Sequence, residues 1–154
     1  MNRYTSNSLE ETQKIAADWL ARVSAEHSNT ISMETKSAFV AGLSGHLGAG
    51  KTAFTKLVAK ELGIGEEITS PTFVIMKIYD TQHPTFKRFV HIDAYRLERA
   101  QELEALDFER ITSDSNNLVL IEWPENVGLT NGEGFKLDQL LKFEIRDGMH
   151  VIEM

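Results

Sequence analysis

Apolar residues recur every three or four positions in two stretches of the chain, and this spacing predicts two amphipathic helices. The first helix is expected over residues 6–26, where Ser8 and Glu11 fit a capping box at its start. The second is expected over residues 52–63 and ends at Gly63, a residue type that commonly terminates helices. The apolar positions are Leu9, Ile15, Ala16, Trp19, Leu20 and Val23 in the first helix, and Phe54, Leu57, Val58 and Leu62 in the second.

Short apolar runs bounded by turn-forming residues predict β-strands. These runs cover residues 36–45, 72–80, 86–93 and 117–123. Near the end of the sequence, residues 138–145 and 149–154 flank the pair Asp147-Gly148, which is a strong hairpin signal. The charged residues 99–111 predict one further helix.

The order of these elements predicts an α/β protein. Strands and helices alternate early in the chain, whereas antiparallel pieces are added in the middle and at the end. This order favours a mixed central sheet with helices on both faces and a C-terminal β-hairpin. Residues 1–154 are expected to form a single domain, because domains of about 100–150 residues are the commonest and no linker or repeat divides the sequence.

The composition disfavours several classes of protein. Cysteine is absent, so neither a disulfide framework nor a thiolate zinc site is expected. No apolar run is long enough to span a membrane and the first residues hold no signal-peptide core, so a cytoplasmic protein is expected. The net charge of −7 disfavours direct binding to a phosphate backbone, which usually needs a basic face. If the chain serves a nucleic acid, a partner is expected to hold it.

The stretch GHLGAGKT at residues 45–52 carries the clearest chemistry. It fits the phosphate-loop pattern G-x-x-x-x-G-K-[ST], with a predicted strand before it and a predicted helix after it. Glycines let several backbone N–H groups turn inward around a phosphate, and the helix N-terminus adds a positive dipole end. The residues expected to hold the nucleotide here are Gly45, His46, Leu47, Gly48, Ala49, Gly50, Lys51, Thr52 and Ala53.

Two residues of this loop have distinct expected roles. Lys51 carries a point charge to the outer phosphates, and the Thr52 hydroxyl is of the type that ligates the Mg²⁺ bridging them. The chain is therefore predicted to bind a nucleoside triphosphate. The alternative is a glycine-rich turn with an exposed lysine.

Hydrolysis needs an acid near the metal and a group that orients water. Glu122 and Asp93 each end a predicted strand, where open α/β sheets place their ligands. The residue types do not decide which of the two contacts the metal directly, and each could instead be a solvated acid at a strand end. His91 lies two residues before Asp93, on the same strand face, and fits a core histidine.

Four other positions near the predicted site have two interpretations each. Ser70 and Thr72 suit a switch segment that senses the γ-phosphate, or a proline turn that initiates a strand. Arg96 is either a charge-stabilising arginine or, as we favour, a surface or packing residue. Trp123 belongs either to the core or to a lid over the site.

Four segments in this order and spacing resemble one family. GHLGAGKT, SPTF, HIDAYRL and IEWPE, between about residues 8 and 128, are similar to the TsaE family, small ATPases of bacterial tRNA threonylcarbamoyladenosine biosynthesis. The phosphate loop alone is widespread, and its combination with HIDAYRL and IEWP is far more specific. One departure is His46, where family members usually carry aspartate. His46 lies within the loop at a position that the pattern leaves open, where it could contact phosphate or, as we favour, face solvent.

The resemblance implies a P-loop NTPase fold with ATP and Mg²⁺ as ligands. It implies partnership with the TsaD and TsaB proteins, which modify adenosine 37 of certain tRNAs, and contact with tRNA only through that complex. ATP hydrolysis would drive or reset the transfer complex. The resemblance implies that Thr52 and Glu122 are metal ligands and that Asp93 is a second acid near the metal. It also implies that Lys51, Thr72 and Trp123 belong to the site. Residues 8–12 resemble the segment that lies near the adenine.

Three other functions compete with this one. A small-molecule kinase would need an acceptor pocket and an arginine-bearing lid, for which residues 96–110 are the available segment, although acids match its arginines. A GTPase-type switch is disfavoured because the guanine signature N-K-x-D is absent. A non-enzymatic scaffold would keep the loop without using it.

Overall fold

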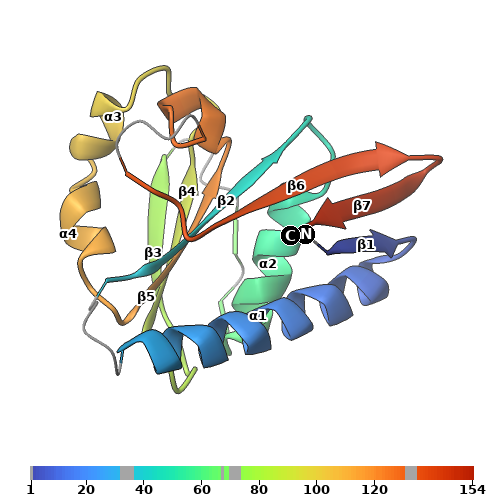
Figure 1. The fold of residues 1–154 in the computed structure, drawn as a ribbon, viewed down its shortest axis with the longest axis horizontal. Helices are drawn as coiled ribbons and strands as arrows, with labels where there is room; N and C mark the ends of the chain where they lie inside the picture. Colours follow the sequence, from blue (N-terminus) through green and yellow to red (C-terminus); the bar gives the residue numbers. More distant parts are fainter. Residues whose placement is uncertain (1, 32–36, 67, 70–73, 131–134) are drawn as a thin grey trace.

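The computed structural model describes residues 2–31, 37–66, 68–69, 74–130 and 135–154. They form a seven-stranded sheet with helices on both sides (Figure 1). The strands are β1 (Arg3–Ser6), β2 (Phe39–Gly45), β3 (Met76–Asp80), β4 (Arg88–Asp93), β5 (Asn117–Glu122), β6 (Gln139–Arg146) and β7 (Met149–Glu153). The helices are α1 (Leu9–Ile31), α2 (Lys51–Glu61), α3 (Gln101–Glu104), α4 (Phe108–Thr112) and the 3₁₀ helix η1 (Pro124–Val127).

The sheet is mixed, as the sequence predicts. Its strand order is β1-β7-β6-β2-β5-β4-β3. The centre is parallel, with β2 between β5 and β6 and with β4 beside β5. The outer pairs β3–β4, β6–β7 and β1–β7 are antiparallel. Because β2, β4 and β5 are parallel, their carboxyl ends at Gly45, Asp93 and Glu122 meet at one edge of the sheet.

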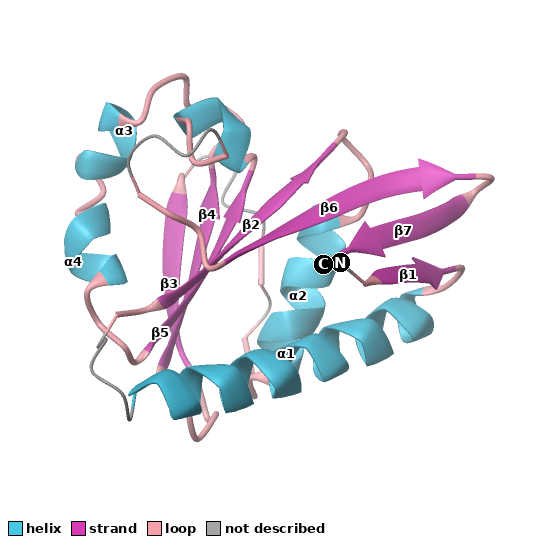
Figure 2. Cartoon of the chain, viewed as in Figure 1, coloured by secondary structure: helices cyan, strands magenta, loops and turns pink. Residues whose placement is uncertain are grey.

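The two faces of the sheet are covered by different helices (Figure 2). Residues alternate along β5, so that Leu118 and Leu120 pack with α1 and α2, whereas Val119 and Ile121 pack with α3, α4 and η1. This alternation is the strand period of two acting on a sheet buried on both sides. The predicted α/β class, with helices on both faces and a C-terminal hairpin, is confirmed.

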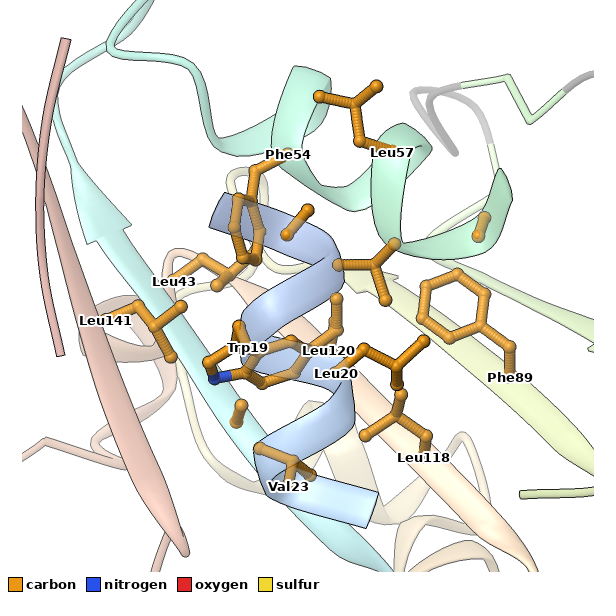
Figure 3. Close-up of a cluster of buried hydrophobic side chains, with 14 of the residues drawn as sticks. Trp19, Leu20, Val23, Leu43, Phe54, Leu57, Phe89, Leu118, Leu120 and Leu141 are labelled. Atoms are coloured by element: carbon orange, nitrogen blue, oxygen red, sulfur yellow. The ribbon is translucent and has the colours of Figure 1, made fainter. Parts of the chain in front are cut away.

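Trp19 anchors the larger core between α1, α2 and the sheet (Figure 3). Its side chain is buried, and its ring meets Phe54 edge to face, with centroids 5.7 Å apart. The indole Nε1–H donates to Gln139 Oε1 at 2.9 Å, so its one polar atom is satisfied. The contact fixes α1 against β6 as well as against α2.

The predicted helix over residues 99–111 is broken in the structure. α3 ends at Glu104, α4 begins at Phe108, and Asp107 between them has a left-handed φ of 59°. Both Leu103 and Phe108 are buried in the same core cluster. One straight helix would point them about 140° apart, at about 100° per residue, so the break lets both reach the core.

The N-terminal segment differs from expectation in two ways. Strand β1 had no counterpart in the prediction, because its four residues carry no alternating apolar pattern and its pairing with β7 is long-range. At the start of α1, Ser8 Oγ accepts from the Glu11 N–H at 3.2 Å, as a capping box requires. Glu11 Oε2, however, accepts from the Asn7 N–H at 2.7 Å instead of the Ser8 N–H.

The turn between β6 and β7 supplies a test of backbone conformation. Asp147 and Gly148 have φ of 52° and 77°, as the predicted hairpin requires. A Cβ added at Gly148 would meet no atom within 4 Å, so strain alone should make Gly148→Ala lower the free energy of unfolding by about 1 kcal/mol. Urea denaturation measures this. Gly65→Ala is the matched control, open but without positive φ, and an equal loss in both variants would contradict the prediction.

No helix within the described part of the chain is both long and apolar enough to cross a membrane.

Candidate active site

The phosphate-loop sequence connects the end of β2 at Gly45 to the start of α2 at Lys51. Gly50 precedes α2 with φ of 109°, a conformation that side chains disfavour. A Cβ there would also come within 3.3 Å of the His150 ring. The loop therefore has the strand–loop–helix form that the motif requires, and glycine at position 50 is needed on two grounds.

A cavity of about 450 Å³ lies beside this loop, at the carboxyl ends of the parallel strands. It is lined by Leu47, Gly48, Gly50, Lys51, Thr52, Ala53, Asp93, Tyr95, Arg96, Glu122 and Trp123. Six of the nine predicted loop residues and both predicted acids therefore share one cavity. Of the other loop positions, Ala49 lines a second cavity described below, while Gly45 and His46 lie outside this lining.

Lys51 is held back by the loop itself. Its ammonium donates to the carbonyl oxygens of Gly45 and His46, the latter at 3.0 Å. It also lies 3.9 Å from the centroid of the Trp123 ring, a cation–π contact. Burial lowers the pKa of Lys51, and the carboxylates of Glu122, Glu125 and Asp93 oppose this. An ammonium has three N–H donors, so one is left for a further acceptor such as a phosphate oxygen.

Neighbouring side chains hold both oxygens of the Glu122 carboxylate. It is only 2% exposed, at the end of β5. The Thr52 hydroxyl donates to Oε2 at 2.9 Å, and His91 Nε2 lies 2.8 Å from Oε1. Both carboxylate oxygens are thus held by neighbours from α2 and β4, which orients the group toward the loop.

The sequence suggested that His91 only fills the core, but in the structure it also contacts Glu122. Its side chain is fully buried, and its Nδ1 has no hydrogen-bond partner among the described residues. Since a carboxylate only accepts, we assign the ring proton to Nε2, which donates to Glu122. His91 is therefore a positioning residue for the carboxylate.

Replacing His91 by phenylalanine should remove this donor while filling the same space. A buried carboxylate that loses a partner costs about 1–3 kcal/mol, so the free energy of unfolding of His91→Phe should fall by that amount. Chemical denaturation measures the loss. Adding Glu122→Gln to His91→Phe should recover part of it, because the neutral amide needs less compensation; full additivity of the two changes would argue against coupling.

Asp93 faces the same cavity from the end of β4. It stands opposite Glu122 in the parallel β4–β5 register, and its Oδ1 accepts from the Tyr95 N–H at 3.0 Å. Asp93 is partly exposed, whereas Glu122 is buried. The two acids thus differ in access to solvent, which the sequence does not indicate.

The oxygen groups here fit Mg²⁺. Magnesium prefers oxygen ligands and usually keeps several waters, binding through one or two protein groups plus phosphates. The Thr52 hydroxyl and the Glu122 carboxylate are 2.9 Å apart, with Asp93 on the neighbouring strand. Among the described residues no cluster of three His, Cys, Asp or Glu could hold a metal by itself. The site therefore suits a metal that arrives with a phosphate ligand.

Aromatic residues border the cavity. The backbone of Trp123 is in the left-handed region, with φ of 59°, and its backbone N–H donates to the Leu43 carbonyl oxygen at 3.1 Å. Its ring contacts Tyr95, with centroids 5.1 Å apart. Trp123 therefore lines the cavity and packs partly against the core, so the core interpretation holds in part and the lid interpretation stays a prediction. The prediction did not include Tyr95.

Several other predictions are now located. Arg96, which the sequence favoured as a surface or packing residue, lines the cavity. His46 is exposed, as expected. Ser70 and Thr72 lie outside the described residues, so the switch interpretation stays a prediction.

A second cavity, of about 270 Å³, lies on the other side of the loop. Its lining joins the start of α1, the loop and the C-terminal hairpin, through Asn7, Ser8, Leu9, Thr12, Ala49, Gly50, Ala53, Phe143, His150 and Ile152. The two cavities share Gly50 and Ala53. No sequence motif marks the hairpin residues. Pairing of β6 with β2 brings them beside the loop, and pairing of β7 with β1 brings them beside the start of α1.

The chain is similar to curated proteins and to a solved structure. It is 40% identical over 108 residues to a tRNA threonylcarbamoyladenosine biosynthesis protein TsaE of Streptomyces coelicolor, covering 68% of this chain and 63% of that protein. The protein of the same name from Haemophilus influenzae is 30% identical, with coverage of 80% and 74%. The crystal structure of Bacillus subtilis YdiB has a TM-score of 0.62 and 26% identity, covering 98% and 82%.

The chain matches less than two thirds of the length of two of these relatives. The matched region spans 63% of the Streptomyces protein and 58% of a Borreliella burgdorferi relative of the same name, which is 43% identical to the chain. The sequence model of one family, described as threonylcarbamoyl adenosine biosynthesis protein TsaE, matches residues 6–150. The chain therefore belongs to the TsaE family.

Proposed function

We propose that the chain is a Mg²⁺-dependent ATPase that serves tRNA threonylcarbamoyladenosine biosynthesis. It would act as an accessory subunit of TsaD and TsaB, hydrolysing ATP to drive or reset their transfer of the group to adenosine 37. The observation that carries this proposal is the convergence of Lys51, Thr52 and Glu122 on one cavity beside a phosphate loop. Family membership supplies the biological setting.

The two cavities suggest how the nucleotide is divided. The triphosphate would enter the cavity lined by Lys51 and Thr52, and the base would enter the cavity at the start of α1. Gly50 and Ala53 border both, so one molecule can extend across them. The resemblance of residues 8–12 to the segment near adenine supports this direction.

Each residue has a defined part in this proposal. Thr52 and Glu122 would hold the magnesium ion, and His91 keeps the Glu122 carboxylate oriented. Bound magnesium supplies positive charge against the phosphate oxygens. Lys51 would donate to the outer phosphates. Asp93, the more exposed acid, is the group that can accept a proton from attacking water.

Two features support slow turnover alone and stimulation by a partner. Lys51 is bound by its own loop, so the site is not preorganised for a transition state. Leu47 and Tyr95, at the rim of the cavity, are 79% and 54% exposed, an apolar rim that a partner can cover. The net charge of −7 agrees with tRNA being held by the partner.

A small-molecule kinase is the second candidate, and the fold gives it less support. Its lid would have to come from the charged segment after Arg96. Leu103, Phe108 and Ile111 of that segment are instead buried in the core against the sheet. Arg96 still lines the cavity, so phosphate transfer to added metabolites remains the discriminating assay.

The experiment that tests the proposal is ATP hydrolysis by the purified chain at fixed Mg²⁺, with and without purified TsaD and TsaB. Slow hydrolysis that rises when both partners are present is the expected result. Hydrolysis that is indifferent to the partners would overturn the accessory role and leave only a nucleotide-hydrolysing site. No hydrolysis under either condition would overturn the ATPase proposal itself.

A further inference from the structure

His150 joins the C-terminal hairpin to the phosphate loop. It lies on β7, opposite Ser6 of β1 and Ile145 of β6. Its Nδ1 is 3.0 Å from the carbonyl oxygen of Ala49, inside the loop. The ring also lines the second cavity, where the proposed function seats the base. His150 is therefore held by the loop on one side and faces the cavity on another.

The contact with Ala49 determines which ring nitrogen carries the proton. A carbonyl oxygen can only accept a hydrogen bond, so Nδ1 must donate. In the neutral imidazole, a proton on Nδ1 leaves Nε2 with a lone pair and no hydrogen. Among the described residues Nε2 has no hydrogen-bond partner. The ring thus offers an acceptor of fixed polarity to whatever binds there.

The other polar side chains of this cavity have no such fixed polarity. These side chains are the amide of Asn7 and the hydroxyls of Ser8 and Thr12, and each can both donate and accept a hydrogen bond. The Thr12 hydroxyl is also engaged, 2.7 Å from Ser6 Oγ and 3.1 Å from the Ser8 carbonyl oxygen. Ser8 Oγ already accepts from the Glu11 N–H. Among the polar side chains that line this cavity, His150 is therefore the one whose polarity is fixed by its contact with the loop.

We propose that His150 selects the base of the nucleotide, with Nε2 accepting a hydrogen bond from the 6-amino group of a purine. A 6-oxo purine would present a second acceptor at this position, and two lone pairs would face each other. The inference rests on the proposed function, because that function seats the base in this cavity. It makes His150 the residue that favours ATP over 6-oxo nucleotides, through a contact rather than through shape.

Two variants of His150 distinguish the role of Nδ1 from the role of Nε2. In His150→Asn the side-chain amide reaches the position of Nδ1 and can still donate to Ala49, but nothing occupies the position of Nε2. In His150→Ala both contacts are lost. The ligands are ATP and ITP, which share the sugar and triphosphate and differ at the 6-position and the adjoining N1 of the ring.

Titration calorimetry with Mg²⁺ gives the dissociation constant of each ligand. Wild type should bind ATP about tenfold more tightly than ITP, the preference expected of one polar contact with its mismatch. In His150→Asn this preference should fall to about twofold, because ATP loses its hydrogen bond and binds more weakly while ITP loses the mismatch and binds more tightly. His150→Ala should weaken both ligands, because the loop also loses its contact at Ala49.

The same titrations distinguish failure of this inference from failure of the proposed function. Binding of ATP that is equal in wild type and Lys51→Ala would overturn the nucleotide site itself. Loss of binding in Lys51→Ala, together with an ATP-to-ITP ratio that is the same in wild type and His150→Asn, would overturn only the role of His150. If His150→Asn does not fold by circular dichroism, His150→Gln replaces it. Its amide reaches the position of Nε2 with both polarities, so the same fall in preference is expected.

Discussion

Replacing Lys51 by alanine should raise the dissociation constant for Mg²⁺-ATP about 100-fold, the loss expected when a charge-assisted contact to phosphate disappears. In the free protein the ammonium lies against two loop carbonyls and the Trp123 ring. In the proposed complex the ammonium would donate to phosphate oxygens of full negative charge, through its third N–H or in exchange for those contacts. Calorimetric titration of the variant with ATP at fixed Mg²⁺ measures the effect.

The stability of Lys51→Ala should change little, since the variant loses two hydrogen bonds but also a buried ammonium that costs free energy to desolvate. A free energy of unfolding within about 1 kcal/mol of wild type is expected. Lys56→Ala is the control, because Lys56 is an exposed lysine of the same helix. Equal ATP affinity in all three proteins would eliminate Lys51 from the site.

Glu122→Gln should lower the rate of ATP hydrolysis by about 100- to 1,000-fold, as removal of one preorganised electrostatic group does in other active sites. The amide keeps the size of the carboxylate and can still accept from His91. It removes the negative charge beside the Thr52 hydroxyl, where the metal is proposed to bind. ATP affinity should change by less than about fivefold, because the phosphate loop supplies most of the contacts. Single-turnover hydrolysis and ATP titration separate the two effects.

Glu125→Gln is the matched control for Glu122→Gln. Glu125 also follows β5 and accepts from the Ser44 hydroxyl at 3.2 Å, but it does not line the cavity. Hydrolysis should therefore be near wild type in this variant. Comparable losses in both would attribute the effect to general charge near Lys51, and an unchanged rate in Glu122→Gln would remove that residue from the mechanism.

The parts of the site that follow local rules were accessible from the sequence. The loop at residues 45–52 is contiguous, and Asp93 and Glu122 each end an apolar strand, so parallel pairing alone brings them together. The helix over 99–111 failed because helical propensity says nothing about where Leu103 and Phe108 must point. In the structure both side chains are buried in the same core cluster, and the helix is interrupted between them.

Features that depend on long-range pairing were not accessible. The Glu122–His91 hydrogen bond follows from the β4–β5 register, and a sequence alone does not give the ring orientation. The contact of His150 with the loop was missed entirely, since β7 lies near the loop through its pairing with β6 and that of β6 with β2. Arg96 is exposed, as favoured from the sequence, but nothing local indicated that it would also line the cavity.

The pairing of β1 with β7 also constrains when the second cavity can exist. Arg3 pairs with Glu153 and Ser6 with His150, so segments from opposite ends of the sequence meet here. A chain emerging from the ribosome makes the phosphate loop and both acids long before β7 is synthesised. The triphosphate half of the site can thus fold during translation, whereas the half that contains His150 closes last. On the proposal above, selection of the base would therefore require β7, whereas binding of the triphosphate would not.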